Sequence, residues 1–225
     1  WVFLSRDDEK PPKGFAGETI DVPVRRIVCM SSSYVAFLEA LGADSTICAI
    51  SGTGYIWSDK VRNRIAGGEI AEAGFDNSLN FEKLVALKPD VVFLYGLTGK
   101  NAVTDKLHEL GLKTVYIGDY VENNPLGRAE WITVFGEFTG RRELARTLFD
   151  SISNEYNRAK ALVSGVEKRP EVMLNAPWQD SWFVPGDRSY MVRLLEDAGG
   201  NYACRGVDSD QSRPISTETA FVAAS

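Results

Sequence analysis

The sequence is poor in histidine and in long apolar runs, two features on which whole classes of protein depend. It contains one histidine, His108, and no uninterrupted apolar run of the roughly 18 residues or more that a membrane-spanning helix needs. The lone histidine excludes a zinc or manganese site built from several imidazoles, and it argues against a Ser-His-Asp triad.

Cysteine is scarce as well. Three cysteines are too few for a disulfide framework, and their odd number leaves at least one thiol unpaired. Cys29 and Cys48 lie in apolar, strand-like runs, so we expect buried thiols at both positions. Cys204 lies in a polar stretch, where the sequence leaves a free thiol and a paired one equally open.

Positive charge is in deficit. The chain has 25 lysines and arginines against 31 aspartates and glutamates, which gives a formal net charge of -6. Because binding to nucleic acid phosphates requires a basic face, this balance argues against nucleic acid as a partner.

The motifs of nucleotide-dependent enzymes are incomplete. Gly52-Thr53-Gly54 begins like a dinucleotide-binding loop, but Trp57 stands where the third glycine would be. There is no G-x-S-x-G nucleophile motif either. We therefore expect no cofactor and no enzymatic activity, and we keep a Rossmann-like oxidoreductase or nitrogenase-fold relative with an unrecognised cofactor site as the alternative.

The most informative stretch that the chain does contain runs from residue 80 to residue 95. Asn80 can cap a helix, Glu82 suits the positive end of that helix, and Pro89 stops it. The apolar run 91–95 that follows is typical of a buried parallel strand. Similar runs at 27–30, 46–50 and 114–117 alternate with helical segments at 31–41 and 102–110. The pattern predicts a parallel sheet with helices on both faces.

The pattern changes after residue 128. Apolar residues recur every four positions at Leu144, Leu148, Ile152 and Tyr156, which predicts a long amphipathic helix with an interruption near Gly140. We expect these four residues to lie on one buried stripe of that helix. Strand signals return after Pro170. We therefore expect an irregular or β-rich arm (1–25), an α/β lobe (26–128), a connecting helix (129–167) and a partial second α/β lobe (168–225).

Aromatic residues gather where the predicted strands end. Ligands of open α/β sheets bind at the carboxyl ends of the strands, and an aromatic-lined site suits a large, flat, partly apolar ligand. The predicted ligand-binding residues are Tyr55, Trp57, Phe75, Tyr95 and Trp178. Packing between the two lobes is the alternative role for any one of these rings.

Several segments, taken in order, resemble the substrate-binding proteins of ABC importers that carry vitamin B12, ferric siderophores or heme and have a helical backbone between their lobes. The matching segments are 26–33, 37–43, 81–95, 110–115, 135–140, 143–145 and 194–201. The resemblance implies an α/β fold of two Rossmann-like three-layer lobes joined by a long rigid helix. Since the chain ends at Ser225 inside a helix-like segment, we expect the second lobe to be incomplete here.

The same resemblance implies the function and partners. It implies capture of an iron chelate or cobalamin in an interlobe cleft by a monomeric protein, and delivery to the transmembrane subunits of an ABC permease. It places the protein in the periplasm or lipid-anchored at the outer face of the cytoplasmic membrane. The start at Trp1 rather than Met is consistent with a removed export segment.

One glutamate on each lobe docks onto permease arginines in this family, and the matching positions are Glu82 and Glu218. They stand in a short internal echo, Asn80-x-Glu82-x-x-Val85-Ala86 against Ser216-x-Glu218-x-x-Phe221-Val222. Without the resemblance, each glutamate would simply complement a helix dipole, an interaction worth about 0.3–1 kcal/mol. A sensory or adhesive module that kept the fold and lost transport is a further alternative.

Overall fold

The computed structural model describes residues 1–75, 78–96, 102–178, 181–206 and 208–223. The chain divides into two compact units, and each is described by itself. Unit 1 comprises residues 1–118 and 131–147, and unit 2 comprises residues 119–130 and 148–225. Helix α6 (Arg142–Leu162) contributes residues to both units.

Unit 1 is built on a five-stranded sheet in which every neighbouring pair of strands is parallel, in the order β5-β4-β3-β6-β7. The strands are β3 (Ile27–Cys29), β4 (Ile47–Ile50), β5 (Ala71–Glu72), β6 (Val91–Tyr95) and β7 (Thr114–Ile117). The prediction of a parallel sheet through four apolar segments is confirmed. The two-residue strand β5 at its edge was not predicted, because Ala71 and Glu72 are too few to show a pattern.

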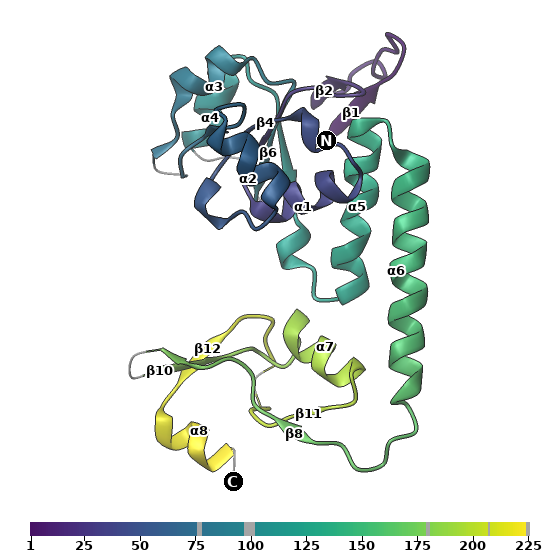
Figure 1. Ribbon diagram of the computed structural model, residues 1–225, viewed down its shortest axis with the longest axis vertical. Coiled ribbons are helices and arrows are strands. Elements are labelled where there is room, and N and C mark those ends of the chain that lie inside the picture. Colours follow the sequence, from purple (N-terminus) through teal and green to yellow (C-terminus); the bar gives the residue numbers. More distant parts are fainter. Residues whose placement is uncertain (76–77, 97–101, 179–180, 207, 224–225) are drawn as a thin grey trace. The chain divides into compact units, whose positions relative to one another are not determined.

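Helices cover both faces of this sheet (Figure 1). On one face, Val28 and Val92 pack in a core with Leu84 of α3 (Phe81–Leu87) and Leu107 of α4 (Ala102–Glu109). On the other face, Phe93 lies 5.1 Å, ring to ring, from Phe135. The helices there are α1 (Ser32–Ala40) and α5 (Pro125–Thr139). Successive residues of a strand point to opposite faces, which is why Val92 and Phe93 join different cores.

The remaining elements of unit 1 are short. The arm predicted over residues 1–25 contains two paired parallel strands, β1 (Val2–Ser5) and β2 (Glu18–Asp21), and Arg6 of this arm contacts Glu137 of α5 at 2.5 Å. Helix α2 is Asp59–Ala66, and the 3-10 turns η1 and η2 are Asp44–Thr46 and Thr53–Tyr55.

The long helix expected after residue 128 is two helices, α5 and α6. Gly140 ends α5 with a φ of 69°, a conformation that glycine adopts at little cost. The helices meet so closely that a Cβ atom on Gly136 would lie 2.5 Å from Cβ of Ala145. Arg142 also holds Glu137 with two charged hydrogen bonds, from Nε at 2.5 Å and from an Nη at 2.7 Å.

The buried stripe predicted on α6 is wrong. Leu144 and Ile152 are 42% and 44% exposed, whereas the buried residue of α6 is Ala145. Residues four apart do share a face of a helix, but burial depends on which neighbours cover that face, and here α5 meets α6 at Ala145.

Unit 2 combines a parallel pair of strands with a small antiparallel sheet. Its strands are β8 (Glu171–Val172), β9 (Pro177–Trp178), β10 (Ser181–Val184), β11 (Asn201–Tyr202) and β12 (Arg213–Ile215). Its helices, besides α6, are α7 (Tyr190–Asp197) and α8 (Thr217–Ala223), with a 3-10 turn η4 at Asp119–Val121. Val184, Val192 and Ala220 form part of a common core. The strands predicted near 171 and 182 are present, and the antiparallel pairing of β10 with β9 and β12 was not predicted.

Candidate functional site

The candidate site lies where the parallel strands of unit 1 end. Three strands, β3, β4 and β5, finish at the same edge of the sheet, because neighbouring parallel strands place their carboxyl ends together. β3 leads into α1 through Ser31, whose hydroxyl accepts a hydrogen bond from the amide of Ser33 at 3.3 Å. β4 leads into residues 51–57 and β5 into Gly74 and Phe75. The segments after β4 and β5 therefore carry three of the predicted aromatic residues.

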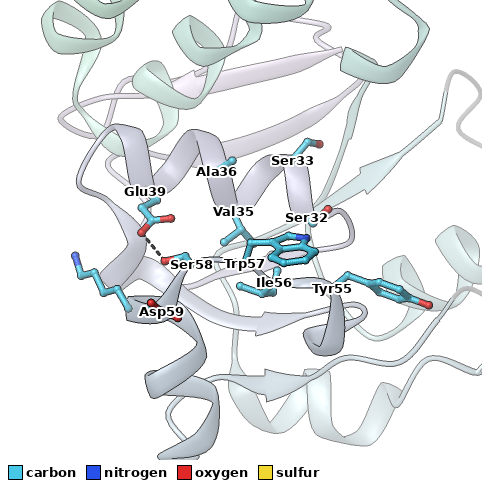
Figure 2. Close-up of a pocket in the computed structure, with 11 residues that line it drawn as sticks. Ser32, Ser33, Val35, Ala36, Glu39, Tyr55, Ile56, Trp57, Ser58 and Asp59 are labelled. Carbon is cyan, nitrogen blue, oxygen red and sulfur yellow. Dashed lines mark hydrogen bonds between the residues drawn. The ribbon is translucent and has the colours of Figure 1, made fainter. Parts of the chain in front are cut away.

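An open pocket of about 920 Å³ lies between α1 and residues 55–60. Ser32 and Ser33 line it from the first turn of α1, and Tyr55 and Trp57 line it from the loop after β4. Trp57 is 91% exposed and Tyr55 is 70% exposed. Figure 2 shows the indole of Trp57 beside the start of α1, with the ring of Tyr55 pointing away from it.

The rings of Tyr55 and Phe75 both approach the backbone of Gly52. A Cβ atom on Gly52 would lie 2.9 Å from Cδ2 of Tyr55 and 3.4 Å from Cε1 of Phe75. Both rings therefore pack against the bare backbone of Gly52, which also has a φ of 76°. Phe75 remains 55% exposed, so the pair is held in place while part of its surface faces solvent.

Glu72 links these loops by hydrogen bonds, and this role was not predicted from the sequence. Its carboxylate accepts hydrogen bonds from the amides of Gly52 (3.0 Å), Thr53 (2.8 Å) and Gly74 (3.0 Å), and from the Thr53 hydroxyl at 2.7 Å. Burial by itself would raise the pKa of Glu72, but these four hydrogen bonds outweigh it and lower that pKa. A glutamate at the end of a strand is usually solvated, so nothing in the sequence singled out Glu72. The two glycine-containing loops, at 52–54 and at 74, were the pattern that could have indicated a carboxylate joining them.

The contacts of Glu72 also bear on the alternative of a nucleotide site. A dinucleotide loop needs backbone amides that point at the phosphates. Here the amides of Gly52 and Thr53 already donate to Glu72, so this loop is not arranged to bind a phosphate.

The two remaining predicted ligand-binding residues are Tyr95 and Trp178. Tyr95 is the last residue of β6, 43% exposed, and β3 separates its strand from β4. Trp178 belongs to β9 in unit 2, and its side chain falls outside the part that the structure describes. Tyr55, Trp57, Phe75 and Tyr95 therefore all follow or end strands at the carboxyl edge of the unit 1 sheet.

The two predicted docking glutamates occupy equivalent local positions. Glu82 lies in the first turn of α3, where the Asn80 side chain accepts from the amide of Lys83 at 2.9 Å. Glu218 lies in the first turn of α8, where the Ser216 hydroxyl accepts from the amide of Thr219 at 3.2 Å. Both glutamates are exposed, and hydrogen bonds from its own amide and from Ser216 lower the pKa of Glu218.

Unit 2 has a smaller, polar pocket of about 340 Å³ that the sequence did not predict. Arg188 and Arg193 line it together with Asn123, Asn124, Asp187 and Glu196. Arg188 contacts Asp208 at 2.5 Å and Arg193 contacts Asp197 at 3.5 Å, so both guanidinium groups already face a carboxylate.

The described residues hold no group of three or more histidine, cysteine, aspartate or glutamate side chains arranged to bind a metal ion. Among their helices, none combines the length and apolar character that a membrane span requires.

Comparison with known proteins gives a consistent result. A family model described as periplasmic binding protein matches residues 27–224. An uncharacterized lipoprotein of Methanocaldococcus jannaschii is 28% identical over 96% of this chain, and the chain spans only 56% of that protein's length.

Solved structures show the same fold. The periplasmic heme-binding protein HutB of Vibrio cholerae superposes with a TM-score of 0.70 and 20% identity, over 88% of this chain and 72% of that one. The periplasmic vitamin B12-binding protein BtuF of Vibrio cholerae superposes with a TM-score of 0.66 and 13% identity, over 89% of this chain and 74% of that one.

Proposed function

Because this chain belongs to the periplasmic binding protein family, we propose that it is the capture protein of an ABC importer for an iron chelate, either siderophore or heme, or for cobalamin. The family consists of binding proteins, so the chain is not an enzyme. Proteins of similar fold include one that binds heme and one that binds vitamin B12, which supports this range of ligands.

The observation that carries the proposal is the exposure of aromatic rings beside an open pocket. Trp57, Tyr55 and Phe75 are 91%, 70% and 55% exposed, although such large apolar side chains usually bury most of their surface. Rings held at the ends of parallel strands offer flat faces on which a macrocycle or chelate stacks. Tyr95 and Trp178 are proposed to add contacts from neighbouring segments. The predicted placement of the ligand between two lobes stays a prediction.

The direct test is titration of the protein with hemin, cyanocobalamin and a ferric hydroxamate, followed by tryptophan fluorescence and visible absorption. One of the three should bind, and Trp57→Ala should weaken that binding by about tenfold or more, since a stacking contact contributes on the order of 0.5–1.5 kcal/mol beyond the area it buries.

Trp1→Ala is the matched control, because Trp1 is 97% exposed and is not among the residues that line the pocket. Equal loss of affinity in both variants, or the absence of binding to all three ligands, would count against the proposal.

We propose the same partners and location as the family implies. The permease subunits would meet Glu82 and Glu218, one from each lobe, and the protein would act as a monomer outside the cytoplasmic membrane. The lipoprotein description of the relative supports a lipid anchor. Residues 26–128 and 168–225 are proposed as the two lobes, with α6 as the stiff part of their connection.

A further inference from the structure

We propose that Glu72 is a positioning residue, which fixes the loops carrying Tyr55, Trp57 and Phe75 in the arrangement that receives the ligand. The inference rests on the proposed function for its ligand, but its structural part stands on contacts within unit 1. All the contacts on which it rests are made by residues that the structure describes.

The hydrogen bonds of Glu72 are fully committed to the two loops. A carboxylate offers about four acceptor positions. Oε1 takes the amides of Gly52 and Gly74, and Oε2 takes the amide and the hydroxyl of Thr53. Each of the four donors belongs to a loop that carries an aromatic residue of the site. The residue therefore links segments that are about 20 positions apart in the chain.

The position of Glu72 is itself fixed by the sheet. Glu72 pairs with Ile50 in the register between β5 and β4, and the amide of Ala73 donates to the carbonyl of Ile50 at 2.8 Å. The side chain thus starts from a strand end beside the last residue of β4 and reaches the turn that follows. Because charged acceptors form hydrogen bonds about twice as strong as neutral ones, this carboxylate holds the turn more firmly than a neutral side chain would.

The position of the turn after β4 determines where the aromatic rings lie. Gly52 donates to Glu72 and presents its bare backbone to Tyr55 and Phe75, so both rings pack against a residue that Glu72 holds. Trp57 follows two residues after Tyr55, on the pocket side. Releasing Glu72 should therefore loosen Tyr55, Phe75 and Trp57 while leaving the core of the sheet intact.

The first experiment needs no ligand. Hydrogen exchange of the amides of Gly52, Thr53 and Gly74 is measured in the full chain and in Glu72→Ala, with the amides of Val28 and Val92 as reporters of the sheet. In Glu72→Ala the three loop amides should exchange about tenfold faster or more, and the sheet amides should keep their protection.

Glu72→Gln gives a sharper expectation. Its single amide oxygen can still accept from Gly52 and Gly74, and its NH2 can donate to the Thr53 hydroxyl, but it cannot accept from the Thr53 amide. We therefore expect faster exchange at Thr53 alone. Glu69→Gln is the matched control, because Glu69 lies three residues away and contacts Arg64 at 2.9 Å instead of the loops.

The second experiment measures affinity for whichever of hemin, cyanocobalamin or the ferric hydroxamate the unmodified chain binds. Glu72→Ala should weaken binding about tenfold or more and change the near-ultraviolet circular dichroism of the aromatic residues, while Glu69→Gln should do neither. Unchanged loop exchange, or affinity lost no more than in Glu69→Gln, would overturn the inference. If the unmodified chain binds none of the three ligands, the proposed function fails, and loop exchange still decides whether Glu72 holds the loops.

Discussion

Tyr156 of α6 donates its hydroxyl to Asp197 of α7 over 2.8 Å and so joins two helices of unit 2. Lys160, one turn further along α6, contacts the other oxygen of the same carboxylate at 2.8 Å. Arg193 approaches Asp197 at 3.5 Å from within α7. The Asp197 side chain is only 12% exposed, so this small network is a largely buried polar link between the two helices.

Tyr156→Phe should lower the free energy of unfolding by about 1–2 kcal/mol. The change removes one hydrogen bond to a largely buried carboxylate and keeps the ring. Burial, followed by the hydrogen bond to Asp197, raises the pKa of Tyr156, so the hydroxyl stays a donor throughout the usual pH range. Urea unfolding measures the effect. Tyr55→Phe, in a ring that is 70% exposed, serves as control and should stay within about 0.5 kcal/mol of the unmodified chain.

The stabilising contribution of Asp197 to unit 2 should be lost in acid. Burial alone would raise the pKa of Asp197, but hydrogen bonds from Lys160 and Tyr156 outweigh it and lower that pKa. A carboxyl whose folded pKa is depressed stabilises the fold above its unfolded pKa of about 3.9, and this contribution disappears as pH falls through the folded value. Asp197→Asn should therefore be less stable than the unmodified chain at pH 7, and the difference should shrink below about pH 4. A difference that stays constant from pH 7 to pH 2 would contradict this reading.

Gly136 should not tolerate alanine, although alanine normally stabilises a helix relative to glycine by about 0.5–1 kcal/mol. The added Cβ would lie 2.5 Å from Cβ of Ala145 and 3.2 Å from the carbonyl oxygen of Arg141. Overpacking of this kind costs about 1–3 kcal/mol, so Gly136→Ala should be destabilising. Gly165→Ala, with no atom within 4 Å of its Cβ, is the control and should change the unfolding free energy by less than about 0.5 kcal/mol. Stabilisation by Gly136→Ala would show that α5 and α6 are not in this close contact.

The three cysteines should react slowly with a thiol reagent in the native protein and completely after unfolding. All three are free and buried, and burial raises the pKa of each thiol. Since the thiolate is the reactive form, a raised pKa and lack of access both slow the reaction. Cys204 is 6% exposed, Cys48 4% and Cys29 0%, so Cys204 should react first and Cys29 last. Counting labelled thiols by mass spectrometry at increasing urea concentration tests this order.

The sequence predicts the sheet of unit 1 well because its strands are continuous apolar runs. Segments such as 91–94 are buried on both faces, and that composition marks a parallel strand without help from distant residues. The buried stripe on α6 was wrong for a different reason. A recurrence of four looks helical, but whether a side chain is buried depends on which neighbours cover it, and here the contact runs through Ala145 and Gly136.

The site was only partly predictable. Exposed aromatics at strand ends could be found, because strand ends follow from the strands themselves. Glu72 could not, since its role depends on two loops meeting in space at Gly52 and Gly74. The identification as a periplasmic binding protein came from segment order and is confirmed by the family match, whereas the roles of individual residues stay predictions.

Variants of Glu82 and Glu218 can distinguish a role in permease docking from a role in ligand binding. Both are exposed in the first turn of short helices, where a carboxylate favours the helix dipole whatever else it does. If they dock onto a basic permease surface, Glu82→Ala and Glu218→Ala should leave ligand affinity unchanged and strongly reduce uptake into vesicles carrying the permease, because removing an interface charge weakens association with the partner. Glu167→Ala, an exposed glutamate outside both helices, is the control and should transport normally. Normal uptake by both docking variants would return the two glutamates to the role of helix-start carboxylates, and loss of ligand affinity would place them in the binding site instead.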